Sequence, residues 1–265
     1  MPREHVREAI AAARVAREEL GLGLEQPVHD FLRIVEETEA VPVAVLGLAD
    51  RVAGAYLVRR SQPFVFVNGA QAVQRQRFTL AHELGHHRLG HAAVVDGVEE
   101  VEGQSDEPLE QQANAFAGEF LAPDRALHAW MEANDDPRLD LHVLVRLATW
   151  FGISAPAAFV RLVQADILRN TRQRQDLKRL LDRGAHGGVQ RALGLEPVED
   201  TLARLHRKNA YPYVPARLRD NALTAYAAGL IDLDRLTGAL RSSREKVEQL
   251  VQALGIEPVG PEPDW

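Results

Sequence analysis

The first half of the chain passes from helical to strand-like hydrophobic patterning. Apolar residues recur at helical spacing over 4–20 and again over 28–39, which predicts two surface helices. Between 41 and 67 the pattern changes to three short β-branched runs, VPVAVL, VAGAYLV and PFVFVN, which predict a small antiparallel sheet. A helical stretch at 72–89 follows, and the acidic, glycine-containing segment at 96–107 predicts a loop.

The rest of the chain is patterned almost entirely as helices. Pro108 stands where a first helical turn would begin, and the pattern that follows it stops before Pro123. The order of elements indicates an α+β fold class. We expect three regions: the sheet with its long helix in 1–125, a helix-turn-helix-like segment in 126–168 and a mainly helical region in 169–265.

The composition excludes several kinds of chemistry but says little about the fold. The 265 residues include no cysteine, which excludes a disulfide framework, a thiolate nucleophile and a sulfur-rich zinc finger. Any bound metal therefore needs nitrogen and oxygen ligands. No run approaches the ~20 apolar residues of a membrane span, and the N-terminal residues alternate in charge where a signal peptide would be apolar. We expect a cytoplasmic protein that does not bind a membrane.

The segment with candidate chemistry is His82-Glu83-Leu84-Gly85-His86, an H-E-x-x-H motif within the predicted helix. At about 100° per residue, His86 lies about 40° round the helix from His82 and one turn further on, so both imidazoles can face one ion. Glu83 flanks them and is placed to take a proton from water. Two neutral imidazoles suit Zn²⁺ and leave room for a third protein ligand and a water whose pKa falls toward ~7. The motif therefore predicts a hydrolytic zinc site.

The third ligand decides the class of metal hydrolase. The metzincin pattern places glycine three and histidine six residues after the second histidine, but this chain has Leu89 and Ala92 there. On a continuous helix His87 and His91 lie about 140° and about 180° from His82, so neither reaches the same ion. We therefore expect the third ligand on a following helix.

Glu110 is the residue that we expect to complete the site. It shares one helix stripe with Ala113, Asn114 and Ala117, and these small residues permit close packing against the histidine helix. A carboxylate on a buried stripe needs a partner, and a cation provides one. Asn114 is placed to accept the other imidazole proton of a ligand histidine. The competing interpretation of Glu110 is a carboxylate favoured by the helix macrodipole. The other downstream glutamates are Glu99, Glu100, Glu102, Glu107 and Glu119.

Two blocks, RQRFTLAHELGHHRLGH and EQQANAFAGEFLAP, resemble the ImmA/IrrE family of zinc-dependent peptidases. The resemblance covers roughly 28–163. It implies a zincin-like domain in which His82, His86 and Glu110 hold zinc, with Mn²⁺ as the substitute ion to consider, and Glu83 is the general base. Members are cytoplasmic and typically cleave a helix-turn-helix repressor of the XRE type, which here would be a separate chain. Cleavage of the repressor switches on the expression of stress-response, DNA-damage-response or mobile-element genes.

Several interpretations of residues outside the predicted metal site stay open. Residues 63–68 form either an edge strand that pairs with an extended substrate or an ordinary sheet strand. The turn at 152–154 resembles a helix-turn-helix, but the second helix offers only Arg161 and Gln164 to read bases, so packing or repressor docking is favoured over DNA binding. The candidates for stabilising an oxyanion are Tyr56, Arg75, Arg77 and His128. The alternative functions are a hydrolase of another substrate and a DNA- or protein-binding regulator with a structural metal.

Overall fold

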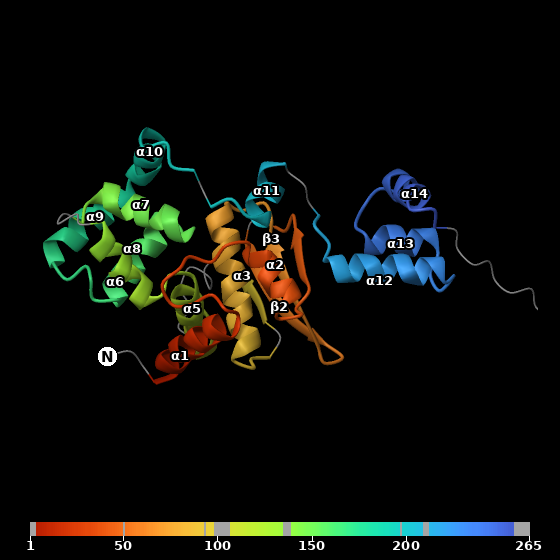
Figure 1. Ribbon diagram of the computed structural model, residues 1–265, viewed down its shortest axis with the longest axis horizontal. Helices are drawn as coiled ribbons and strands as arrows, with labels where there is room; N and C mark the ends of the chain where they lie inside the picture. The colour runs from red at the N-terminus through yellow and green to blue at the C-terminus, as the bar shows by residue number, and fades with distance from the viewer. Residues whose placement is uncertain are drawn as a thin grey trace, which may run out of the picture.

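A four-stranded sheet lies near the middle of the molecule (Figure 1). The computed structural model describes residues 4–49, 51–92, 94–97, 107–134, 139–196, 198–208 and 212–256. The strands are β1 (Val43–Leu46), β2 (Val52–Arg59), β3 (Gln62–Asn68) and β4 (Val94–Gly97), in the order β1-β3-β2-β4. With helices before and after this small sheet, the predicted α+β class is confirmed.

Two features of the sheet differ from the prediction. β2 pairs antiparallel with β3 and β4, but β1 and β3 are parallel. The chain reverses direction between β1 and β2 and again between β2 and β3, so β3 runs parallel to β1 when it lies beside it. Asp96 and Gly97, which we assigned to a loop, pair with β2 as the end of β4. Residues 98–106 of that predicted loop lie outside the described residues.

Three helices form the layer beside the sheet: α1 (Glu4–Glu19), α3 (Val73–Arg88) and α5 (Pro108–Leu121). α3 packs against β2 and β3, α5 packs on α3, and α1 packs on α5 (Figure 1). Arg17 of α1 is fully buried and donates from Nη1 to the carbonyl oxygen of Phe120 at 2.5 Å. Burial lowers the pKa of Arg17 to about 10, so its guanidinium remains charged at neutral pH. The cation thus partners a carbonyl at the C-terminal end of α5, and α1 fixes α5 in place.

Most of the remaining helices extend the same hydrophobic core. They are α2 (Phe31–Glu37), α6 (Asp124–Ala133), α7 (Leu141–Phe151), α8 (Ala155–Gln164), α9 (Thr171–Asp182), α10 (Ala185–Ala192) and α11 (Thr201–Arg207). α11 returns to the sheet region and packs on α2 and α3. Among the described helices none is by itself long and apolar enough to cross a membrane, and α7 and α8 reach that length and hydropathy only as a pair bent by 98°.

The last three helices stand apart from this core (Figure 1). They are α12 (Ala216–Ala227), α13 (Leu233–Ala239) and α14 (Arg244–Ala253). Their own small core contains the buried side chains of Ala222, Leu236, Val247 and Val251. The segment before α12 is tied to the sheet, because Tyr213 exchanges two backbone hydrogen bonds with Val45 of β1, at 3.1 and 2.8 Å.

A partly buried acid beside this tie is expected to make stability depend on pH. The Tyr213 hydroxyl donates to Glu36 Oε2 at 2.7 Å, and burial raises the pKa of Glu36 above its ordinary value. The unfolded chain therefore loses this proton first as pH rises, so Glu36 contributes stability at low pH that is lost as pH increases from about 4.5. Glu36→Gln keeps an acceptor for Tyr213 and does not titrate. We expect its free energy of unfolding, relative to the unchanged chain, to rise between about pH 4 and pH 8 in urea titrations.

The exposed neighbour Glu37 provides the matched control. Glu37→Gln removes a carboxylate that pairs with Arg33 at the surface, so its pH dependence should follow that of the unchanged chain much more closely. A stability difference for Glu36→Gln that stays constant over the same pH range would contradict the expected cost of ionising Glu36.

Candidate metal centre

The structure brings His82, His86 and Glu110 together between α3 and α5. Both imidazoles are fully buried, and their Nε2 atoms lie 3.0 Å apart. Glu110, on the first turn of α5, has one carboxylate oxygen 3.2 Å from Nε2 of His82 and the other 3.5 Å from Nε2 of His86. In the described part of the chain this is the one group of three or more histidine, aspartate or glutamate side chains with a metal-binding arrangement.

The separations within this group fit a zinc ion. Ligand atoms at about 2.0–2.1 Å from a tetrahedral centre stand about 3.3 Å from one another. The 3.0 Å between the two Nε2 atoms and the 3.2 Å from Nε2 of His82 to Oε2 of Glu110 lie close to that value, and Nε2 of His86 lies 3.5 Å from the other carboxylate oxygen, Oε1. Two imidazole nitrogens and a carboxylate oxygen are also a donor set that zinc accepts, and the fourth position is left for a water or a substrate. The residues present therefore fit the ion that the motif predicts.

Close packing of α3 on α5 makes these distances attainable. A Cβ atom on Gly85, between the two histidines, would lie 3.2 Å from the ring of Phe116 on α5. α3 and α5 therefore approach each other closely at Gly85, the residue of α3 that has no side chain. Asn114, one turn after Glu110, places its Oδ1 3.1 Å from Nδ1 of His82. Since an amide oxygen only accepts, Nδ1 of His82 carries the proton and the unprotonated Nε2 faces the cluster.

Glu83 lies beside the cluster but is not part of it. Its side chain is fully buried and faces β2, where a Cβ atom on Gly54 would lie 2.4 Å from Glu83 Oε1. The same Cβ would lie 2.8 Å from the carbonyl oxygen of Phe66, so β2 can pass this close only with glycine at 54. The site therefore holds three potential ligands and one adjacent carboxylate, the set of groups that metal-assisted hydrolysis requires.

Comparison with protein families agrees with this geometry. Residues 41–163 match the model of the IrrE N-terminal-like domain, Peptidase_M78. This chain therefore carries an ImmA/IrrE-type metallopeptidase domain. A search of curated proteins gave no match. The matched segment contains the sheet, α3 and α5, whereas α1, which packs on α5, lies before it.

His91 is a residue of this metallopeptidase domain whose position sequence reasoning missed. The helix α3 ends at Arg88, and Gly90 adopts a φ of 70°, so the chain turns back and the His91 amide donates to the His86 carbonyl oxygen at 3.0 Å. The His91 ring then lies against His86, with their Nδ1 atoms 2.9 Å apart. Burial lowers the pKa of His91, against the raising effects of a hydrogen bond with Gln112 and the charge of Glu110. The available signal was Gly90, a typical residue after a helix C-terminus.

The other glutamates that were candidate ligands are placed elsewhere or lie outside the described residues. Glu107 is the residue before α5. Glu119 is buried at the far end of α5, where it accepts from Arg14 at 2.7 Å and from Arg161 at 2.6 Å. Glu99, Glu100 and Glu102 lie outside the described residues.

The oxyanion candidates are already engaged in contacts of different kinds. The Tyr56 hydroxyl lies 3.1 Å from Nδ1 of His87, and burial raises the pKa of Tyr56, which keeps its phenol neutral. Arg77 is buried and paired with Asp200, and His128 Nε2 lies 3.2 Å from the carbonyl oxygen of Ala165. Arg75 lies on the first turn of α3, about two turns before His82. Tyr56 is thus the member of this set whose contact lies next to the metal-binding motif.

Two further interpretations are settled by the fold. The idea that 63–68 is an edge strand is wrong, because β3 pairs on one side with β1 and on the other with β2. Arg161, one of the two side chains of the second helix that could have read bases, is buried and donates to Glu119, to Asp124 and to the carbonyl oxygen of Ala122. This side chain therefore packs α8 against α5 and α6 and does not face a DNA groove.

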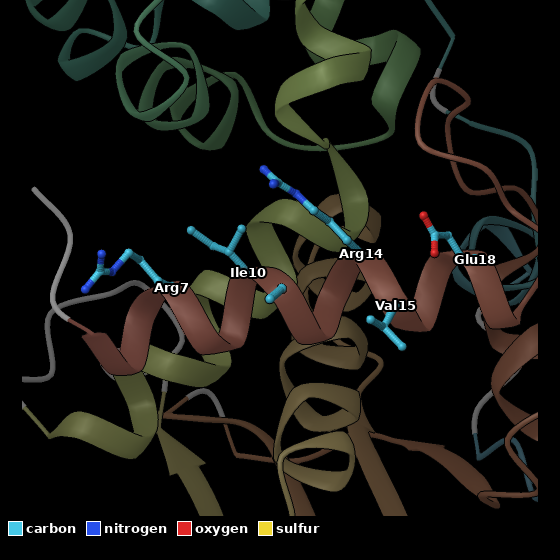
Figure 2. Close-up of a pocket in the computed structure, with 6 residues that line it drawn as sticks. Arg7, Ile10, Arg14, Val15 and Glu18 are labelled. Atoms are coloured by element: carbon cyan, nitrogen blue, oxygen red, sulfur yellow. The ribbon is translucent and has the colours of Figure 1, made fainter.

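A hollow on the outer side of α1 is separate from the metal centre. Figure 2 shows that all of its lining side chains come from this one helix, with Arg7, Ile10, Arg14, Val15 and Glu18 labelled. Arg14 leaves this surface to reach Glu119 and Asp124. The hollow is thus a feature of the α1 surface and contributes no residue to the His82, His86 and Glu110 cluster.

Proposed function

We propose that this protein is a zinc-dependent endopeptidase that cleaves a separate XRE-type transcriptional repressor at one site. The observation that carries the proposal is the buried His82, His86 and Glu110 cluster next to Glu83, inside a segment that matches a peptidase family. In this proposal the three clustered residues hold the metal, Glu83 is the catalytic base and Asn114 orients His82.

The proposed chemistry assigns a separate task to each group. Zinc, or Mn²⁺ in its place, would act at this site as a Lewis acid that polarises a carbonyl group and lowers the pKa of water toward neutral pH. Glu83 takes the proton from the attacking water and delivers it to the leaving amine. Its burial next to β2 limits the directions in which the carboxylate can turn, which favours one proton path. Asn114 holds the Nδ1 proton of His82, so that its Nε2 faces the cluster.

The substrate and the setting belong to the same proposal. We assign peptidase activity to 1–125, a packing or docking role to the helix-turn-helix-like segment 126–168 and an accessory role to 169–265. The repressor is a separate cytoplasmic protein, and its cleavage switches on the expression of stress-response or mobile-element genes. Burial of Arg161 supports packing over DNA reading for α8.

A metal-dependent cleavage assay tests the proposal. The purified chain should contain about one zinc per molecule and should cut a purified XRE-type repressor encoded next to it at one bond, seen as two fragments by mass spectrometry. A chelator should stop the cleavage, and added Zn²⁺ should restore it. Intact repressor in the presence of the zinc-loaded protein would contradict the proposed substrate, whereas absence of zinc binding would contradict the site itself.

A further inference from the structure

Both histidines of the cluster have a partner at the ring nitrogen that points away from it. For His82 this partner is the amide oxygen of Asn114 on α5. For His86 it is His91, whose Nδ1 lies 2.9 Å from Nδ1 of His86 with the two ring planes at 67°. A hydrogen bond between two ring nitrogens requires that one carries the proton and the other accepts it. The orientation of His86 therefore depends on the tautomer of His91.

The surroundings of the two rings decide the direction of this hydrogen bond. Nε2 of His86 faces Nε2 of His82 and the carboxylate of Glu110, so a metal ligand at that position must be unprotonated. The proton of His86 is then on Nδ1, and Nδ1 of His91 accepts it. This leaves the proton of His91 on Nε2.

We propose that His91 is a positioning residue that accepts the Nδ1 proton of His86. The role rests on the proposed metal site. It also gives a reason for the turn at Gly90, which brings His91 back onto the last turn of α3. α5 then supplies one ligand, Glu110, and the support of His82, Asn114, while the turn after α3 supplies the support of His86. Docking of α5 on α3 assembles the ligands and their supports together.

Zinc affinity, measured by competition with a chromophoric chelator, separates this role from simple packing. His91→Leu removes the acceptor and should weaken zinc binding by about 10–100-fold. His91→Asn should recover much of that loss, because the amide oxygen of asparagine stands where Nδ1 stands in histidine. His91→Gln should not recover that loss, because its amide oxygen stands where Nε2 stands in histidine. His29→Asn, an exposed histidine on a loop before α2, should bind zinc as the unchanged chain does.

The outcomes that would overturn the role are distinct from failure of the proposed function. Equal zinc affinity in His91→Leu and in the unchanged chain rejects it, as does an Asn variant as weak as the Leu variant, because ring packing would then be the cause. If His91→Leu does not fold, as judged by thermal unfolding without metal, the Asn and Gln variants decide: equal zinc affinity in His91→Asn and His91→Gln rejects the role. An unchanged chain that binds no zinc rejects the proposed function and this role together. If the zinc affinities change as expected but the unchanged chain does not cleave the repressor, only the proposed substrate is rejected.

Discussion

Replacing Glu83 by glutamine is expected to reduce repressor cleavage by at least about 10²–10⁴-fold while zinc stays bound. Glutamine has nearly the same shape as glutamate but cannot take the proton of the attacking water. Glu83 is not one of the three clustered ligands, so the metal content should be unchanged. The measurement is a single-turnover cleavage time course with zinc content determined on the same sample.

The control for this prediction is Glu18→Gln on the exposed outer side of α1 (Figure 2). It removes the same functional group far from α3 in the sequence and should cleave at the rate of the unchanged chain. Cleavage at an undiminished rate by the zinc-loaded Glu83→Gln protein would exclude Glu83 as the proton acceptor. Loss of zinc from that variant would instead show that Glu83 helps to hold the metal.

Features that depend on a single helix were predictable from the sequence. The relation between His82 and His86 follows from helical periodicity alone, so a five-residue motif is enough to predict that both rings face one point. Glu110 needed one more step, because the small residues around it predicted that α5 packs closely on another helix. The structure shows this packing at Gly85 and Phe116. The prediction succeeded there because each inference needed only local spacing and residue size.

Features that depend on contacts between distant segments were not predictable in the same way. The central place of β3 depends on how three strands pair, and the hydrophobic pattern of an interior strand resembles that of an edge strand. The sequence offered Arg77 as an oxyanion candidate and Arg161 as a side chain able to read bases, but each is buried against a carboxylate from a distant segment. His91 was assigned to the wrong side of a continuous helix, because the turn at Gly90 changes its direction.

The buried pair of Arg77 and Asp200 is expected to have the largest effect on stability. Arg77 lies on α3, five residues before His82, and its guanidinium and the Asp200 carboxylate are both almost fully buried. It also donates to the carbonyl oxygens of Val28 and Gly152, at 2.7 and 3.1 Å. Arg77→Met would leave the Asp200 carboxylate buried without a cation, which should lower the free energy of unfolding by about 3–5 kcal/mol in guanidinium titrations.

A double variant shows whether the buried charge causes this loss. Asp200 also accepts from the Ala203 amide at 2.9 Å as the N-cap of α11, and Asn keeps that oxygen while it removes the charge. Arg77→Met with Asp200→Asn should therefore recover part of the stability that Arg77→Met loses. Arg207→Met, at the end of the same helix, breaks an exposed pair with Glu199, which precedes the helix, and should change stability little. If the double variant is as unstable as Arg77→Met alone, the loss comes from the contacts of Arg77 with Val28 and Gly152, and the ion pair itself contributes little to holding α11 against α3.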